Sequence, residues 1–263
     1  MKVIVTGSKG FIGQNMVKEL KKEHEVVEFD WLEPYPNVKG CDWVIHLGAI
    51  SSTIEERIHC IVKQNLEFSI YLYEECIQHG VNFQFASSAS VYGLISNFKE
   101  NSPLNPKNHY ARSKAMFERY VELRDAPIIT QVFRYFNVYG PHEEHKGKQA
   151  SPHTQFCNQA KVNGTIKLFK GSEKYKRDFI HVSKVVDYHK AFFKVKESGV
   201  WNIGTGSTES FQSVANKISK DKGAVVEYIE MPKVLEGNYQ KFTKASMSKT
   251  NKTLTSQLEA MNG

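Results

Sequence analysis

The 263-residue chain has few of the features that mark disulfide-rich, zinc-binding or membrane-spanning proteins. Its four cysteines lie far apart and form no C-x-x-C pair, which argues against zinc and disulfides and favours a reducing cytoplasm. No apolar run approaches the roughly 20 residues that span a bilayer, so we expect no membrane partner. Because a strand pattern starts at Lys2, we also expect no signal peptide.

The composition is that of a folded globular protein, with 40% hydrophobic and 24% charged residues. The length suits one large α/β domain, or a nucleotide-binding domain with a smaller appendage. The net charge of +7 comes from scattered basic residues interleaved with acidic ones, and no finger, basic zipper or aromatic RNA-binding pattern accompanies them. We therefore expect no nucleic-acid partner, because a polyanionic small molecule explains the excess equally well.

The first half alternates short apolar runs with helix-like segments, which predicts a parallel sheet covered on both faces. The expected strands are residues 2–6, 25–29, 43–47, 83–86 and 128–133. After about residue 141 the pattern loosens. We expect short strands at 166–169, 201–203 and 225–229, a helix after Ser210, and a loosely held polar tail from Lys244.

A glycine-rich turn follows the first expected strand. Gly7, Gly10 and Gly13 allow a tight turn, a close approach of the backbone to a pyrophosphate, and close packing of the following helix. The N-terminus of that helix offers free N–H groups to phosphates. Asp30 ends the second strand, where a carboxylate accepts both ribose hydroxyls of NAD and repels the 2′-phosphate of NADP. The alternative for Asp30 is a solvated loop acid.

Tyr110 and Lys114 are four residues apart, on one face of an expected helix. A nearby ammonium favours the phenolate, so we expect Lys114 to lower the pKa of Tyr110 toward the range of a general base. Ser88 ends the fourth expected strand, where it can hydrogen-bond the oxygen of a substrate carbinol. We expect Ser87 or Ser90 to cap the turn there. The acids and histidines at 142–145 do not have the spacing of a metal site, so no metal is expected.

Together these motifs resemble the extended short-chain dehydrogenase/reductase superfamily of nucleotide-sugar epimerases and dehydratases. The G-x-x-G-x-x-G turn, S-S-A-S-V-Y-G and Y-x-x-x-K stand in the family's order, followed by F-R-Y-F-N-V-Y-G-P at 133–141. Later segments, including H-K-G at 145–147 and K-R-D-F at 176–179, look like those of the ADP-glyceromanno-heptose 6-epimerases. The resemblance implies epimerisation by transient oxidation and re-reduction of a carbinol in a nucleotide-diphosphate sugar.

The resemblance also implies a set of site residues. The catalytic ones are Ser88, Tyr110, Lys114 and Lys146, with Lys146 as a second acid/base group opposite Tyr110. Contacts to tightly bound NADP or NAD are implied for Gly7, Gly10, Phe11, Ile12, Gly13, Asp30, Trp31, Leu47, Gly48, Ala49, Ser51, Asn65, Lys114 and Val138. Contacts to the substrate are implied for Ser88, Asn137, Phe169, Gly171, Ser172, Arg177 and Tyr239.

The expected fold is a doubly wound, Rossmann-like parallel sheet with a small C-terminal substrate-binding lobe. We assign residues 1–140 to the dinucleotide-binding domain, which strands near 178–205 can rejoin, and residues 141–263 mainly to the lobe. The resemblance further implies a homo-oligomer, with the helix at 110–123 as the candidate contact.

Two departures from the family pattern leave alternatives open. Only about a dozen residues separate Asp30 from Trp43, whereas the family usually has a further strand and helix there; the choice between NAD and NADP therefore stays open. The C-terminus is also short. Other readings are a 4-epimerase or keto-sugar reductase of the same family, or a non-catalytic sensor of a nucleotide sugar or dinucleotide.

Overall fold

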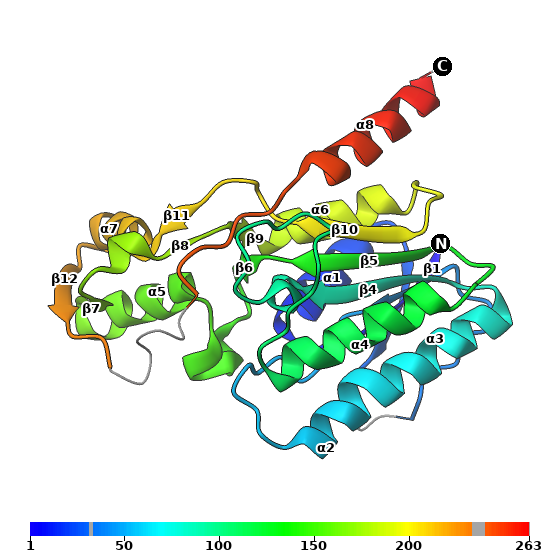
Figure 1. Cartoon of the computed structure of the whole chain (residues 1–263), viewed down its shortest axis with the longest axis horizontal. Coiled ribbons are helices and arrows are strands. Elements are labelled where there is room, and N and C mark those ends of the chain that lie inside the picture. Colours follow the sequence, from blue (N-terminus) through cyan, green and yellow to red (C-terminus); the bar gives the residue numbers. More distant parts are fainter. Residues whose placement is uncertain (32–33, 233–239, 263) are drawn as a thin grey trace.

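Short apolar runs rich in β-branched residues build a six-stranded parallel sheet at the centre of the molecule (Figure 1). In this computed structural model, residues 1–31, 34–232 and 240–262 are described. The strand order is β2-β1-β3-β4-β5-β10, with β1 at Lys2–Thr6, β2 at Glu25–Phe29, β3 at Trp43–His46, β4 at Asn82–Ser88, β5 at Thr130–Tyr135 and β10 at Gly199–Ile203. Because the chain runs from β1 outward to β2 and then back to β3, the sheet has a switch point between β1 and β3.

Two layers of helices cover the sheet, which confirms the doubly wound fold. On one face lie α1 (Phe11–Leu20) and α6 (Val182–Phe192), which pack onto β1 and β3. On the other face lie α3 (Phe68–His79) and α4 (His109–Leu123); a short helix α2 (Ile58–Ile61) and a π-helical turn at Val62–Glu67 lead into α3. None of the described helices is long and apolar enough to cross a membrane.

A second, smaller group of elements follows β5 and lies at one side of the sheet (Figure 1). Parallel strands β7 (Thr165–Phe169) and β12 (Val225–Ile229) pack with α5 (Pro152–Asn163) and α7 (Phe211–Lys222) around a core of their own. Two further pairs connect it to the main sheet: β8 (Lys176–Arg177) with β11 (Glu209–Ser210), and β6 (Asn137–Tyr139) with β9 (Phe179–His181). The strand expected at 201–203 joins the main sheet as β10, beside β5. The two-domain division itself stays a prediction.

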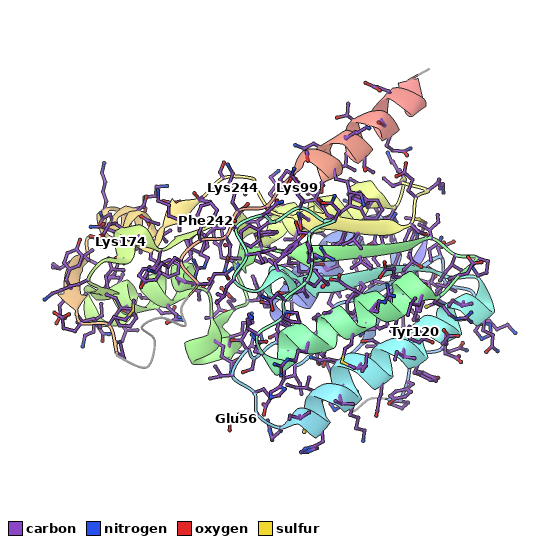
Figure 2. The ribbon with its side chains drawn as sticks, in the orientation of Figure 1. Glu56, Lys99, Tyr120, Lys174, Phe242 and Lys244 are labelled. Atoms are coloured by element: carbon purple, nitrogen blue, oxygen red, sulfur yellow. The ribbon has the colours of Figure 1, made fainter. Side chains whose placement is uncertain are left out.

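The expectation of a loosely held tail is wrong for most of that segment. Residues Ser248–Asn262 form helix α8, whose first turns pack beside β10. Thr250 is fully buried and its hydroxyl donates to the Asn202 carbonyl at 2.8 Å, while the Trp201 indole donates to Thr253 at 3.0 Å. Upstream, Phe242 packs against Phe98 on the segment that leads to this helix (Figure 2). Tertiary hydrogen bonds thus stabilise a polar helix whose sequence has little apolar periodicity.

Asp178 fastens this C-terminal segment to the rest of the molecule. Its side chain is fully buried and accepts hydrogen bonds from the backbone N–H groups of Thr205, Gly206 and Ala245, at 2.8, 2.9 and 3.0 Å. The Thr205 hydroxyl donates a fourth at 2.6 Å. One buried carboxylate therefore joins the end of β8, the loop after β10 and the approach to α8.

Replacing this carboxylate is expected to destabilise the fold. In Asp178→Asn, an NH₂ group must face donors, leaving buried N–H groups unsatisfied, and the free energy of unfolding should fall by roughly 2–4 kcal/mol. Chemical denaturation measures the change. Asp187→Asn is the matched control, because Asp187 is exposed and forms a surface ion pair with Lys184 at 3.2 Å; it should change stability by less than about 0.5 kcal/mol. Equal effects of the two substitutions would contradict the role of Asp178.

Candidate functional site

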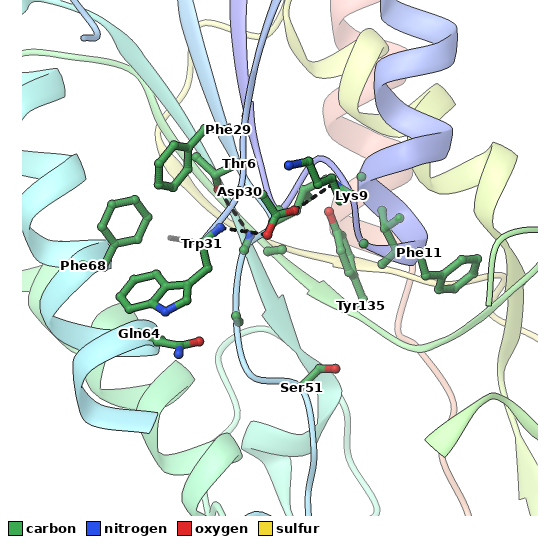
Figure 3. Close-up of a pocket in the computed structure, with 18 of the residues that line it drawn as sticks. Thr6, Lys9, Phe11, Phe29, Asp30, Trp31, Ser51, Gln64, Phe68 and Tyr135 are labelled. Carbon is green, nitrogen blue, oxygen red and sulfur yellow. Dashed lines mark hydrogen bonds between the residues drawn. The ribbon is translucent and has the colours of Figure 1, made fainter. Parts of the chain in front are cut away.

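A cavity of about 430 Å³ opens at the carboxyl ends of β1, β2 and β3, next to the switch point of the sheet (Figure 3). In doubly wound sheets this is the edge at which ligands bind. Most of the residues expected at the cofactor line it, namely Gly7, Gly10, Phe11, Ile12, Gly13, Asp30, Trp31, Leu47, Gly48, Ala49, Ser51 and Lys114. Tyr110 and Lys146 line the same cavity. The structure thus brings residues from five separate segments of the chain together.

The glycine turn is shaped by two close backbone approaches. Gly7 has φ +66°, and a Cβ atom there would lie 2.7 Å from Gly48. A Cβ atom on Gly13 would lie 1.9 Å from the Gly7 carbonyl oxygen. Helix α1 then begins at Phe11 without a side-chain cap, so its first N–H groups face the cavity rim as an anion site. This geometry fits the pyrophosphate of a dinucleotide.

A buried hydrogen-bond chain supports the turn from below. The Gly48 N–H donates to the Thr6 hydroxyl at 3.2 Å, and this hydroxyl lies 2.6 Å from Nδ1 of His46. His46 Nε2 lies 2.8 Å from Ser69 Oγ, whose own proton goes to the Asn65 carbonyl. Since Ser69 Oγ must accept from the imidazole, Nε2 carries the proton and Nδ1 accepts from Thr6. Burial lowers the pKa of His46 well below its usual value, so the ring is neutral.

Asp30 lies at the mouth of the cavity, between the glycine turn and an aromatic wall (Figure 3). Its carboxylate accepts the backbone N–H groups of Lys9 at 2.9 Å and Trp31 at 2.8 Å. On one side, Phe29 stacks on Phe68 with ring centroids 5.3 Å apart, and Trp31 meets Phe68 edge-on at 5.8 Å. The carboxylate is thus held at the end of β2 in the position where a ribose is recognised in this class of sheet.

Tyr110 and Lys114 project from the first turns of α4. The helix begins after Asn108, whose side chain accepts the Ala111 N–H at 2.8 Å. Lys114 is 2% exposed, and its Nζ lies 4.4 Å from the centroid of Phe85 and 5.9 Å from that of Tyr110. The sequence therefore placed both groups correctly on one face of the helix and beside one cavity.

The expected lowering of the Tyr110 pKa is wrong. Burial raises the pKa of Tyr110, and a hydrogen bond with Ser88 only partly opposes this. Burial also lowers the pKa of Lys114 to about 7, against the opposing effect of Glu118, so its ammonium is a weaker source of positive charge near neutral pH. Helical spacing indicates that two side chains are neighbours, but it does not indicate how strongly they are desolvated, and desolvation sets the direction of both pKa shifts here.

The expectation that Ser87 or Ser90 caps the turn after β4 is wrong. Ser88, rather than Ser87 or Ser90, caps the turn Ala89–Tyr92, because its Oγ accepts the Ser90 N–H at 3.2 Å. Ser87 lines the cavity wall and donates to the buried carboxylate of Glu118. Ser88 is not among the residues that line the described cavity, but its hydrogen bond with Tyr110 places it beside the phenol.

Tyr135 is a cavity residue that the sequence did not single out. Its hydroxyl bonds to Nε2 of His189, whose Nδ1 lies 2.6 Å from Gln84 Oε1. Gln84 donates its NH₂ to Gln131 and to the His189 carbonyl, so its oxygen can only accept and His189 Nδ1 carries the proton. The Tyr135 hydroxyl therefore donates to His189 Nε2. The only available signal was its position inside the F-R-Y-F-N-V-Y-G-P segment.

Further cavity residues were also not predicted. They are Thr6, Lys9, Phe29, Gln64, Phe68, Ala86, Ser87 and His145. Several stand next to a predicted residue in the sequence, but Gln64 and Phe68 reach the cavity from the helical segment after α2, which carries no motif. Only the folded structure brings them to the site.

Lys146 reaches the cavity from a 3₁₀ segment, Glu144–Gln149. Its Nζ lies 5.1 Å from the centroid of Phe11 and 3.8 Å from Glu143 Oε1. Burial lowers the pKa of Lys146, while Glu143 acts in the opposite direction. Lys146 is therefore a partly buried amine at the cavity, next to a buried carboxylate.

The remaining predicted residues lie outside the cavity lining. Asn65 is fully buried and bonds to both the N–H and the carbonyl of Ile50, so it positions the loop after β3. Val138 packs in the core beside β9. Asn137, Phe169, Gly171, Ser172 and Arg177 lie on β6, β7, the turn after it and β8, toward the smaller group of elements. Tyr239 lies outside the described residues.

Comparison with known proteins identifies relatives over nearly the whole chain. The sequence profile described as the NAD dependent epimerase/dehydratase family matches residues 3–204. An ADP-L-glycero-D-manno-heptose-6-epimerase of Brachyspira hyodysenteriae is 36% identical over 285 aligned positions, covering 94% of this chain and 90% of that protein.

Two solved structures share the fold with a TM-score of 0.86 and 24% identity each. The Helicobacter pylori ADP-L-glycero-D-manno-heptose-6-epimerase aligns over 97% of this chain and 90% of its own. A UDP-N-acetylglucosamine 4-epimerase from Methanobrevibacter ruminantium aligns over 97% and 91%.

The two buried histidines predict how stability depends on pH. Burial lowers the pKa of His46 and lowers that of His189 to about 3. The unfolded chain protonates both below about pH 6.5, so their contribution to stability is complete above that pH and is lost as the pH falls toward the folded-state pKa. Between pH 6.5 and 5, urea unfolding should show a loss of up to about 1.4 kcal/mol per pH unit for each histidine.

A matched pair of variants separates this effect from general acid sensitivity. His189→Asn removes one of the two buried titrating groups and should flatten the dependence on pH by up to about one proton. His59→Asn, at an exposed position, should leave the slope unchanged. The interpretation is wrong if the two variants have the same slope.

Proposed function

The chain belongs to the NAD-dependent epimerase/dehydratase family, and we propose that it inverts one carbinol of a nucleotide sugar, with an ADP-activated heptose as the substrate. The observation that carries this proposal is the single cavity lined by the glycine turn, Asp30, Tyr110, Lys114 and Lys146. The substrate is inferred from the 36% identical heptose epimerase and from H-K-G and K-R-D-F, which resemble that subfamily.

The residues at the cavity fit a nicotinamide dinucleotide. The close approaches at Gly7 and Gly13 leave room for a pyrophosphate against the backbone, and the start of α1 offers N–H groups to it. Asp30 would hold the adenine ribose, and Lys114 the nicotinamide ribose. We propose NAD rather than NADP, because the carboxylate at Asp30 disfavours a 2′-phosphate. The chemistry that the bound cofactor supplies is reversible hydride transfer.

The protein residues then handle the protons. Tyr110 acts as the phenolate: its ionised oxygen takes the proton of the sugar hydroxyl and becomes the neutral phenol, while Ser88 donates a hydrogen bond to the same sugar oxygen. Lys114 stabilises the phenolate before the proton is transferred, a role supported by the position of its Nζ, 5.9 Å from the centroid of the Tyr110 ring. Lys146, on a separate segment at the same cavity, exchanges a proton on the opposite face of the sugar. Two proton-transferring groups on two faces are what inversion at one carbon requires.

The smaller group of elements is proposed to bind the nucleotide part of the substrate, through Asn137, Phe169, Gly171, Ser172, Arg177 and Tyr239. Two observations support this. Ser172 is 2% exposed and its Oγ has no hydrogen-bond partner in the described chain, so a ligand can satisfy it. The Arg177 guanidinium, which donates to the carbonyls of Lys176 and Gln240, suits a diphosphate because it can donate from several N–H groups at once.

We also propose a homo-oligomer in the cytoplasm. Met116 and Leu123 on α4 are 55% and 69% exposed, an apolar surface on the helix expected to make the contact. The oligomeric state and the location in the cytoplasm both stay predictions.

Substituting the phenol tests the proposed chemistry directly. Tyr110→Phe removes the proton-accepting oxygen but retains the ring, so we expect NAD binding and folding to be retained while turnover falls by at least about 100-fold. NMR analysis of the product from ADP-heptose and from UDP-hexoses measures turnover and also identifies the substrate. Unchanged turnover would remove Tyr110 from the mechanism. If the wild-type protein binds the nucleotide sugar but does not exchange its carbinol hydrogen, the alternative function, a non-catalytic sensor of a nucleotide sugar or dinucleotide, is favoured.

Asp30 provides a test of cofactor choice. In Asp30→Asn the negative charge that repels a 2′-phosphate is lost, so the ratio of the Kd for NADP to the Kd for NAD should fall by about 10-fold or more. Isothermal titration of both cofactors measures the ratio. Asp42→Asn, which removes an acid whose carboxylate bonds to the Lys2 N–H, is the control and should leave the ratio unchanged. An unaltered ratio in Asp30→Asn would show that another residue selects the cofactor.

A further inference from the structure

Glu143 is a buried carboxylate at the base of the segment that carries Lys146. Its side chain is 1% exposed. Oε1 accepts the Ser151 N–H at 2.8 Å, and Oε2 accepts the hydroxyls of Ser151 and Thr154 at 2.7 and 2.6 Å. These donors belong to the first turn of α5, whose N-terminal end favours a negative charge. The carboxylate is thus fixed to α5 through three hydrogen bonds.

The same carboxylate controls the surroundings of Lys146. The Lys146 N–H donates to the Glu143 carbonyl at 3.0 Å, so the 3₁₀ segment starts on Glu143. The Lys146 ammonium lies 3.8 Å from the buried Glu143 Oε1 and 5.1 Å from the centroid of the Phe11 ring. Glu143 therefore contacts both the backbone and the ammonium of Lys146, and Glu143 itself is hydrogen-bonded to α5.

From this geometry we infer that Glu143 is a positioning residue which holds Lys146 protonated and in place for its proton transfer, and which ties that lysine to helix α5. The inference rests on the proposed role of Lys146. It goes further by assigning a function to a residue that does not line the cavity. Because α5 packs in the core of the smaller group of elements, Glu143 connects the proposed nucleotide-binding region to the proton-transferring group.

The other charged groups near Lys146 do not replace Glu143. Asp30 is the only acid among the described residues that line the same cavity. It accepts the Lys9 and Trp31 N–H groups at the end of β2. The other titratable groups in the lining are His145, Tyr110, Lys114 and Lys9. His153, on α5, is a further titratable group near the same carboxylate. Burial lowers its pKa, and the negative charge of Glu143 only partly opposes this effect. Among the described ion pairs, Glu143 is the acid that faces the Lys146 ammonium.

The isosteric variant Glu143→Gln tests the inference. It removes the charge but keeps an oxygen for the α5 donors, so Lys146 should lose its proton at a lower pH. We expect kcat to fall by about 10-fold at pH 8 with KM changed by less than about threefold. We also expect the high-pH limb of the kcat profile to move down by about 1 unit, the usual effect of losing one adjacent opposite charge. Glu144→Gln removes the same charge from the exposed neighbouring residue and should leave the profile unchanged.

Two further variants make the outcomes distinguishable. In Lys146→Met the high-pH limb should be absent, and adding Glu143→Gln should produce no further shift. If Glu143→Gln does not fold by circular dichroism, Glu143→Asp keeps the charge but withdraws it from Lys146, and should move the limb in the same direction by less. A folded Glu143 variant with reduced stability but a wild-type pH profile overturns the inference. Absence of epimerisation by the wild type would instead contradict the proposed function.

Discussion

A buried ion pair between Glu118 and Arg134 holds helix α4, which carries Tyr110 and Lys114, against the sheet. Both side chains are 5% exposed, and Arg134 Nη2 lies 2.6 Å from Glu118 Oε2. Arg134 also donates to the Tyr92 hydroxyl and to the Glu100 carbonyl, each at 3.0 Å. A buried pair of this kind is stable only when further hydrogen bonds satisfy its remaining atoms, and here they do. Because Glu118 is one turn beyond Lys114, the pair also sets the position of Lys114 and Tyr110 relative to β4 and β5.

The same packing creates the electrostatic character of the site. Lys114 and His46 are buried and Tyr110 is partly buried, and desolvation disfavours the charged form of each. Asp30, Lys9 and Lys146 line the same cavity as Tyr110 and Lys114. An anionic ligand there meets the backbone N–H groups at the start of α1, which the fold has already oriented. Such preorganisation is a major source of catalysis in water-excluded sites.

The sequence predicted those parts of the structure that local patterns determine. Strands 2–6, 25–29 and 225–229 have the predicted bounds, and the turn at Gly7 has the positive φ that its motif requires. Helices α5 and α6 were not predicted, and α8 was taken for a loose tail. Polar residues obscure the helical period of α5 and α8, which tertiary contacts stabilise instead.

The site could be predicted only in part for the same reason. Tyr110, Lys114 and the glycines stand in short motifs, whereas Gln64, Phe68 and Tyr135 reach the cavity through the packing of distant segments. The direction of the Tyr110 pKa depends on burial, which is a property of the whole fold and not of the spacing between two residues.

In the described part of the chain no strand or helix lies between β2 and β3, and β2 is at the edge of the sheet, paired only with β1 among the described strands. An open edge of this kind presents unpaired backbone groups that can recruit another chain and seed aggregation. The exposed strand residues Glu25 and Glu28 carry charges, paired with Lys2 at 3.0 Å and Lys21 at 2.6 Å. Charged side chains on such edges hinder pairing with another chain, so Glu25 and Glu28 protect the open edge of β2 without a covering element.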